Sequence, residues 1–235
     1  MVIERDMLIS VLKLTKDGAV LTKTVNKDAR MIALFAAKML KKMENEGLIY
    51  FENGKIAADS QCRVKIAMRA LGLGADLEHV SDLLKWQEFE AIAVIALERN
   101  GYCVSKNVHF KHENHRFEID VVGYKKPMVL CIDCKHWHHG IFPSALARIV
   151  DAQVKRTRAY ADSLPMIKNR NECTKWGRAK FIPVILSLVH GNLKFCDGTP
   201  IIPVLQLQDF INQLPAYSES FRHLTKEFSH LRNDS

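Results

Sequence analysis

Residues 116–136 read RFEIDVVGYKKPMVLCIDCKH, and this stretch decides the fold that we predict around it. Apolar and polar residues alternate over 117–122, which is typical of a β-strand with one buried face. The almost continuous apolar run at 128–135 indicates a second, more deeply buried strand. Gly123 and Pro127 are typical of the tight connection between two strands. The stretch therefore predicts a hairpin at the centre of a sheet.

Charged side chains interrupt this apolar hairpin at a few positions. Asp133 and Lys135 lie two residues apart on the second strand, so they share one of its faces. If the strands pair as a hairpin, Asp120 lies near Asp133 across the pair. Two close carboxylates repel unless one is protonated or a cation lies between them. Mg²⁺ suits such a place because it prefers oxygen ligands. The alternative is an ordinary Asp–Lys pair at the surface of a strand end.

A strong helix is predicted just before the hairpin, at residues 85–100, where apolar residues recur with helical spacing and Gly101 follows. Glu90 lies on this helix ahead of its most apolar part, and Glu88 points roughly the opposite way. Taken alone, Glu90 would be an ordinary surface acid in a first turn, where acids suit the helix dipole.

Further elements follow the hairpin in the predicted fold. Residues 144–163 have the pattern of a helix, and the apolar run at 181–189 indicates a buried strand. Two closing helices are expected at 206–214 and 218–232.

The order of these acidic and basic groups resembles the PD-(D/E)xK nuclease superfamily, which has the restriction-endonuclease-like fold. Its members carry a Glu on a helix, an Asp on one strand and (D/E)-x-K on the next strand. Here those positions are held by Glu90, Asp120, Asp133 and Lys135. Ile119 stands where many members have proline, and Asp133 stands where Glu is more common. The resemblance covers roughly residues 85–190.

The resemblance implies an α/β fold with a mixed central sheet flanked by helices, and metal-dependent hydrolysis of phosphodiester bonds in DNA. Asp120 and Asp133, with the backbone carbonyl of Cys134, would hold Mg²⁺ or Mn²⁺. Glu90 would bind a second ion or orient a water molecule. Lys135 would lie beside the attacking water and the developing charge. Dimerisation is common in this superfamily, so a homodimer is a further expectation.

The first 74 residues predict a separate, smaller α+β domain with a connecting helix. Helical patterns are followed by a hairpin pattern at 48–58, with Asn53–Gly54 as its turn. Helices followed by a β-ribbon resemble a winged helix-turn-helix domain, a class of module that places a helix in a DNA groove. The boundary is expected near Gly74, which assigns residues 75–235 to the nuclease-like domain.

Basic residues indicate where a nucleic acid would bind. The 34 Lys and Arg residues exceed the 26 Asp and Glu residues, and the net charge of +8 favours a polyanionic partner. A helix predicted at 27–46 has Leu34 and Phe35 in its apolar stripe, and it carries lysines that would meet phosphates. Gln153 matches a Gln or Lys that related nucleases often carry after the x-K strand. The candidate nucleic-acid contacts are Lys27, Arg30, Lys38, Lys41, Lys42, Gln153, Lys155 and Arg156. The alternatives are a solvated basic face, or a winged helix that contacts protein.

Other features narrow the class of protein. The sequence has no run of about 18 apolar residues, so no membrane span is expected, and its N-terminus lacks the pattern of a signal peptide. The six cysteines have irregular spacing, which is typical of thiols in a reducing compartment and predicts a cytoplasmic protein. Cys131 and Cys134 would face opposite sides of one strand, which disfavours a shared metal.

Two other functions fit the same sequence. One is a DNA-binding regulator whose nuclease-like domain is catalytically inactive, although the complete set of acids and lysine argues against it. The other is a nuclease that acts on RNA or selects branched DNA, as the archaeal Holliday-junction resolvases of this superfamily do. The sequence does not separate these from a DNA endonuclease.

Overall fold

The computed structural model describes residues 2–135, 142–164, 172–187 and 194–228, and the chain divides into two compact units at residue 92. The first unit therefore extends past Gly74. It includes α5 (Leu77–Leu83) and the first half of α6 (Trp86–Arg99). No helix of the described residues is long and apolar enough to cross a membrane.

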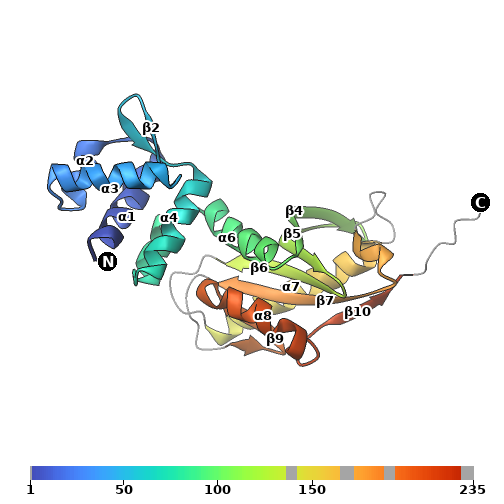
Figure 1. Cartoon of the computed structure of the whole chain (residues 1–235). Helices are drawn as coiled ribbons and strands as arrows, with labels where there is room; N and C mark the ends of the chain where they lie inside the picture. Colours follow the sequence, from blue (N-terminus) through green and yellow to red (C-terminus); the bar gives the residue numbers. More distant parts are fainter. Residues whose placement is uncertain (1, 136–141, 165–171, 188–193, 229–235) are drawn as a thin grey trace, which may run out of the picture. The chain divides into compact units, whose positions relative to one another are not determined.

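The first unit combines helices with a small antiparallel sheet, in which β3 lies between β1 and β2. Asn53 and Gly54 form the turn between β2 and β3 with positive φ angles of 50° and 73°, as predicted for a two-residue hairpin. The elements that precede α5 are α1 (Val2–Leu14), β1 (Val20–Leu21), α2 (Thr22–Asp28), α3 (Ala33–Asn45), β2 (Tyr50–Glu52), β3 (Lys55–Ala57) and α4 (Ser60–Gly72) (Figure 1).

The helix predicted at 27–46 is in fact two helices. A turn separates α2 from α3, and Arg30 in this turn has a φ angle of 52°. The buried stripe of α3 is formed by Ala36, Leu40 and Met43, at positions with helical spacing. Leu34 and Phe35, which we predicted to be buried, are 70% and 60% exposed. That prediction was wrong because the apolar pattern offers two stripes, and packing uses the other one.

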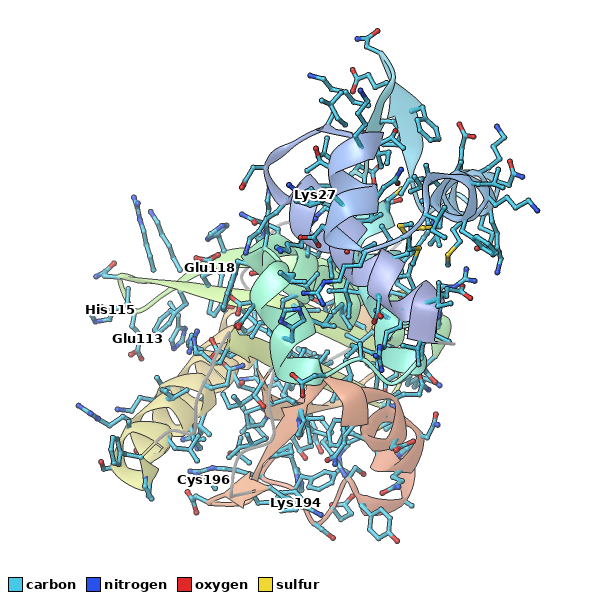
Figure 2. All side chains as sticks on the ribbon, turned by 90° about the vertical axis from the view of Figure 1, so that its left-hand side faces the viewer. Lys27, Glu113, His115, Glu118, Lys194 and Cys196 are labelled. Carbon is cyan, nitrogen blue, oxygen red and sulfur yellow. The ribbon has the colours of Figure 1, made fainter. Side chains whose placement is uncertain are left out.

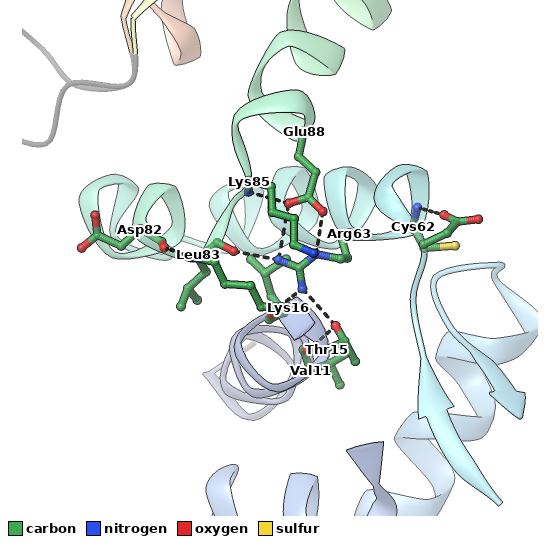
Figure 3. Close-up of polar contacts among 11 residues, drawn as sticks. Val11, Thr15, Lys16, Cys62, Arg63, Asp82, Leu83, Lys85 and Glu88 are labelled. Carbon is green, nitrogen blue, oxygen red and sulfur yellow. Dashed lines mark hydrogen bonds and ion pairs between the residues drawn. The ribbon is translucent and has the colours of Figure 1, made fainter. Parts of the chain in front are cut away.

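A buried ion pair joins the helices of the first unit. Arg63 on α4 is fully buried, and its Nε donates to Oε1 of Glu88 on α6 at 2.7 Å. The same guanidinium donates to the backbone carbonyl of Leu83 (Figure 3). It also donates to the backbone carbonyl of Leu12. The N–H of Lys85 donates to Oε2 of Glu88 at 2.8 Å. These bonds link α1, α4, α5 and the start of α6, which explains why α5 and the start of α6 belong to this unit.

The second unit is built on a mixed sheet. Its described strands run in the order β4-β5-β6-β7-β9-β8, and β10 also pairs with β7. Strands β4, β5 and β6 are antiparallel neighbours, whereas β6–β7 and β7–β9 are parallel pairs. The bounds are β4 (Cys103–His112), β5 (His115–Lys125), β6 (Met128–Lys135), β7 (Arg178–Ser187), β8 (Phe195–Cys196), β9 (Thr199–Pro203) and β10 (Leu224–Glu227).

Helices cover both faces of this sheet. In Figure 1, α7 (Pro143–Ser163) runs behind the sheet and α8 (Leu207–Tyr217) lies in front of it. Strands β4 and β5 form a long hairpin, with Glu113 and His115 near its tip (Figure 2). The arrangement is the mixed central sheet flanked by helices that the sequence predicted.

Two local predictions for this unit were wrong. Residues 218–232 were expected to be helical, but Leu224–Glu227 is a strand because it pairs with the start of β7; residues 229–232 lie outside the described part. Gly123 was expected in a turn but lies inside β5, and the turn is Lys126–Pro127. A Cβ atom at Gly123 would lie 3.0 Å from Leu97 Cδ1, so the glycine lets the second half of α6 approach the sheet.

Replacing Arg63 with methionine should destabilise the first unit, because Glu88 would stay buried without its partner. Removing one member of a buried ion pair costs about 3–5 kcal/mol of unfolding free energy. The double variant Arg63→Met/Glu88→Leu should recover much of that loss. Urea denaturation of the full chain, followed by circular dichroism, measures both. Equal or greater destabilisation in the double variant would show that the two side chains are not coupled.

Candidate active site

Strand β6 carries two of the predicted site residues in a deeply buried setting. Every residue from Met128 to Cys134 is buried, and Asp133 is 1% exposed. Every second residue of β6 lies on the face that α7 covers, and these residues include Cys131, Asp133 and Lys135. On this face α7 contributes Gln153 and Arg156. An ionised side chain at this depth requires compensating charges or hydrogen bonds.

Two cations compensate the charge of Asp133. Arg156 Nη1 donates to Oδ1 at 2.8 Å, and Lys135 Nζ lies 2.9 Å from Oδ2. Within the described residues, Oδ2 nevertheless has no hydrogen-bond partner, so the ammonium contributes through its charge rather than through a hydrogen bond. Each oxygen of this buried carboxylate therefore faces one basic side chain, Oδ1 that of Arg156 and Oδ2 that of Lys135.

The second acid lies beside the first, as the sequence predicted. The β5–β6 ladder ends with Val121 opposite Ile132, and the same register sets Asp120 opposite Asp133. Oδ2 of Asp120 accepts a hydrogen bond from the N–H of Cys134 at 2.7 Å. The carboxylate thus binds a backbone donor just beyond the point where the regular ladder stops.

The backbone of β5 changes its course at this acid. Ile119 and Val122 are three residues apart, yet both belong to the core cluster beneath α7. A regular strand would place them on opposite faces, so the alternation predicted for 117–122 does not hold. Asn107, at the facing position on β4, has a φ angle of 48°. The irregularity allows the side chain of Asp120 to reach the edge of β6.

Burial raises the pKa of the Asp120 carboxyl above its usual value. The hydrogen bond from Cys134 lowers this pKa, and the negative charge of Asp133 raises it again. The positive charges of Lys135 and Arg156 also lower it, so the four side chains interact electrostatically as one cluster. A further cation between the two acids would favour the ionised form of Asp120.

The donors present fit a hard divalent cation. In the parts of the chain that are described, no three His, Cys, Asp or Glu side chains gather as a metal site. Mg²⁺ needs fewer protein ligands, since it commonly binds one or two carboxylates and keeps several waters. The carboxylates of Asp120 and Asp133 are donors of that kind. Cys131 and Cys134 are both buried, and burial raises the pKa of the Cys131 thiol to about 12, so this thiol stays protonated.

Glu90 lies on the half of α6 that belongs to the first unit, and it is buried. It is therefore not the solvated surface acid of the alternative interpretation. Further along α6, Leu97 packs against Gly123, on the sheet face opposite to the one that α7 covers. Glu88, which we considered the poorer site candidate, is the partner of Arg63.

Gln153 does not contact solvent in this structure. Its side chain is fully buried, and its Nε2 donates to the backbone carbonyl of Cys131 at 2.7 Å. A side chain without exposed surface does not reach a nucleic acid, so we withdraw Gln153 from the predicted contacts.

The two other predicted contacts on α7 differ from each other. Lys155 is exposed, whereas Arg156 binds Asp133. The Arg156–Asp133 pair was not predicted. The i, i+3 spacing of Gln153 and Arg156, which places both on one side of the helix, is the sequence signal that could have indicated it.

The five basic residues of the first unit that we predicted to contact nucleic acid all lie at its surface. Lys27, Arg30 and Lys38 are exposed. Lys41 pairs with Glu44 at 2.6 Å, and Lys42 lies 3.7 Å from Glu4 and 3.9 Å from Glu46. Surface ion pairs of this kind are worth about 1 kcal/mol or less, so phosphates could replace the acids at small cost.

Residues 84–180 match the family model described as NERD, nuclease-related domain. The matched range is less than half of the chain, and it contains Glu90, Asp120, Asp133 and Lys135. The match supports a nuclease-like fold for this part and suggests a nuclease-related function.

A protein of Archaeoglobus fulgidus described as uncharacterized is 29% identical over 144 residues, which cover 60% of this chain and 100% of the relative. Two crystal structures, one of a protein of unknown function and one of a protein from Vibrio cholerae, each match at 16% identity with TM-scores of 0.28 and 0.35. They cover 52% and 93% of this chain, which spans 54% and 55% of their lengths. Function must therefore be inferred from the residues of this chain.

Substitutions at Asp120 should separate its charge from its hydrogen bond. Since its pKa is raised in the folded state, folding favours the protonated form, and stability falls as the pH rises through that pKa. Asp120→Asn keeps an acceptor for Cys134 without titrating. In EDTA at neutral pH it should be at least as stable as the wild type, and this advantage should shrink in acid.

Asp120→Ala provides the matched control. It leaves the N–H of Cys134 without its acceptor, which should make it less stable than Asp120→Asn by about 1–3 kcal/mol. Thermal unfolding across a pH series measures both variants. An Asp120→Asn protein that is clearly less stable than the wild type at neutral pH would contradict the raised pKa.

Proposed function

We propose that the second unit is a metal-dependent endonuclease that hydrolyses phosphodiester bonds in DNA. The observation that carries this proposal is the set Asp120, Asp133 and Lys135, which strands β5 and β6 bring together. The match of the surrounding residues to a nuclease-related domain supports it. The order of the groups supports the PD-(D/E)xK type of site and the restriction-endonuclease-like fold.

The chain's own groups have separate tasks in the proposed reaction. Asp120 and Asp133, with the carbonyl of Cys134, would hold the ion, and the Cys134 N–H donates to the Asp120 carboxylate and fixes its position. When bound, Mg²⁺ or Mn²⁺ supplies a water of lowered pKa and neutralises charge on the phosphate oxygens. Lys135 keeps part of its side chain exposed beside Asp133, which suits an ammonium that orients the attacking water and stabilises developing negative charge.

Glu90 enters this proposal through the order of the motif alone. A helical Glu that precedes the two strand acids would bind a second ion or orient the water.

The first unit is proposed to be a winged-helix domain that docks on DNA. The succession α1, β1, α2, α3, β2, β3 and the small three-stranded sheet of the described residues support this assignment. Contacts to phosphates would come from Lys27, Arg30, Lys38, Lys41 and Lys42, and from Lys155 and Arg156 in the second unit.

One observation favours a second function for the first unit, namely contact with protein. Ile32, Leu34 and Phe35 expose large apolar side chains at the start of α3, and such groups gain little from phosphates. A second copy of the chain would be the simplest partner, in line with the expected homodimer. Sedimentation of a Leu34→Glu variant, compared with its binding to a labelled DNA duplex, distinguishes the two roles.

Asp133→Asn and Lys135→Met should each reduce cleavage by about 100-fold or more, because each removes a group that stabilises charge in the transition state. Both substitutions keep nearly the original volume but remove a charge partner, so circular dichroism of each purified variant must first show a folded protein. The matched control is Asp151→Asn, an exposed acid on α7, which should cut normally. The assay is a panel of linear, nicked and branched DNA and single-stranded RNA with Mg²⁺, Mn²⁺ or EDTA.

The panel also decides between the alternatives. If the protein cuts only RNA or only branched DNA, and needs a metal to do so, the reaction is still phosphodiester hydrolysis but the substrate is not linear DNA. Binding without cutting in any metal would favour a DNA-binding regulator with an inactive domain. Full activity in purified Asp133→Asn protein would remove this carboxylate from the reaction.

A further inference from the structure

Arg156 occupies an oxygen of the carboxylate that the proposed metal site needs. Its Nη1 lies 2.8 Å from Oδ1 of Asp133, and its Nε donates weakly to the carbonyl of Ala152 at 3.4 Å. The side chain is therefore directed from α7 to β6. It remains 22% exposed, so the guanidinium lies at the rim of the cluster rather than in the closed core.

The charges of the four side chains balance without a metal when both acids are ionised. Asp120 and Asp133 contribute two negative charges when both are ionised, and Lys135 and Arg156 contribute two positive charges. A divalent cation on Asp133 would come within a few ångströms of both basic groups, and like charges at that distance repel strongly in a partly buried site. A metal ion and the basic side chains therefore compete for the same carboxylate.

Of these two basic groups, Arg156 makes the more specific contact. Its bond to Oδ1 is a directional hydrogen bond from a planar guanidinium, whereas the Lys135 ammonium acts on Oδ2 mainly as a point charge 2.9 Å away. Charge-assisted hydrogen bonds from guanidinium are about twice as strong as neutral ones. Breaking or weakening the Arg156–Asp133 hydrogen bond is therefore the largest free-energy cost of binding a cation at Asp133.

We propose that Arg156 sets the metal affinity of the site, by holding Asp133 in the metal-free protein and yielding it when the ion binds. The released guanidinium, at the exposed rim, is then free to bind a phosphate, which is the contact that the sequence suggested for it. The inference rests on the proposed function for the nature of the ion. It makes Arg156 a positioning residue whose removal tightens metal binding.

The test is calorimetric titration of full-length protein with Mn²⁺ alone. Arg156→Gln should bind Mn²⁺ at least about fivefold more tightly than the wild type, within the usual range of coupling between two binding events. Arg158→Gln makes the same charge change at an exposed position on the same helix, and its Kd should stay within about twofold of the wild type. In an Asp133→Asn background, Arg156→Gln should change the Kd little, because the effect acts through Asp133.

An unchanged or weaker Mn²⁺ affinity in Arg156→Gln would overturn the inference, as would the absence of Mn²⁺ binding in both proteins. If circular dichroism shows that Arg156→Gln does not fold, Arg156→Met provides an uncharged side chain of similar length. Cleavage judges the nuclease proposal separately. If Arg156→Gln tightens Mn²⁺ binding but the protein cuts no substrate, the role of Arg156 in metal binding is supported and the nuclease proposal is contradicted.

Discussion

The buried carboxylate of Asp133 is the constraint on which the candidate site depends. It lies on a strand whose other side chains from Met128 to Cys134 are also buried, between the neighbouring strands β5 and β7. Leaving an isolated charge there would cost several kcal/mol. The fold offsets that cost with a lysine two residues along the same strand and an arginine from α7. Both the packing of α7 and the direction of Lys135 are thus tied to one negative charge.

Asp120 is held by the same strand, β6, but through a backbone hydrogen bond rather than through ion pairs. Its carboxylate receives the N–H of Cys134 where the β5–β6 ladder ends, so it is held by the backbone of the strand that carries Asp133. The two acids are close because the register of one hairpin fixes them, not because flexible side chains meet. The raised pKa of Asp120 follows from burial and from this proximity. A rigid pair of largely buried acids is better suited to bind a cation than to form a simple surface pair.

How much of this was visible in the sequence depends on the range of each interaction. The hairpin and the register that sets Asp120 opposite Asp133 are local features, and both were predicted, although the alternation expected for 117–122 does not hold. The bond between Arg156 and Asp133, the burial of Gln153 and the strand β10 need contacts between distant segments, which the sequence does not specify. Leu34 and Phe35 were misplaced because two apolar stripes fit one helix. Patterns therefore located the acids, whereas packing supplied their partners.

The arrangement around Asp133 reconciles two opposed requirements. A chain with two adjacent buried acids and no cations would fold poorly until a metal arrived, because the acids would repel each other or take up protons. With Lys135 and Arg156 in place the charge of Asp133 is compensated, so the second unit can fold before any ion binds. The same compensation weakens the attraction for a cation, since each positive side chain opposes it. Stability without metal and affinity for metal are therefore set against each other by the same two residues. Lys135 is fixed to the strand beside the acid, whereas Arg156 projects from a separate helix toward the exposed rim, so Arg156 is the one able to exchange its partner.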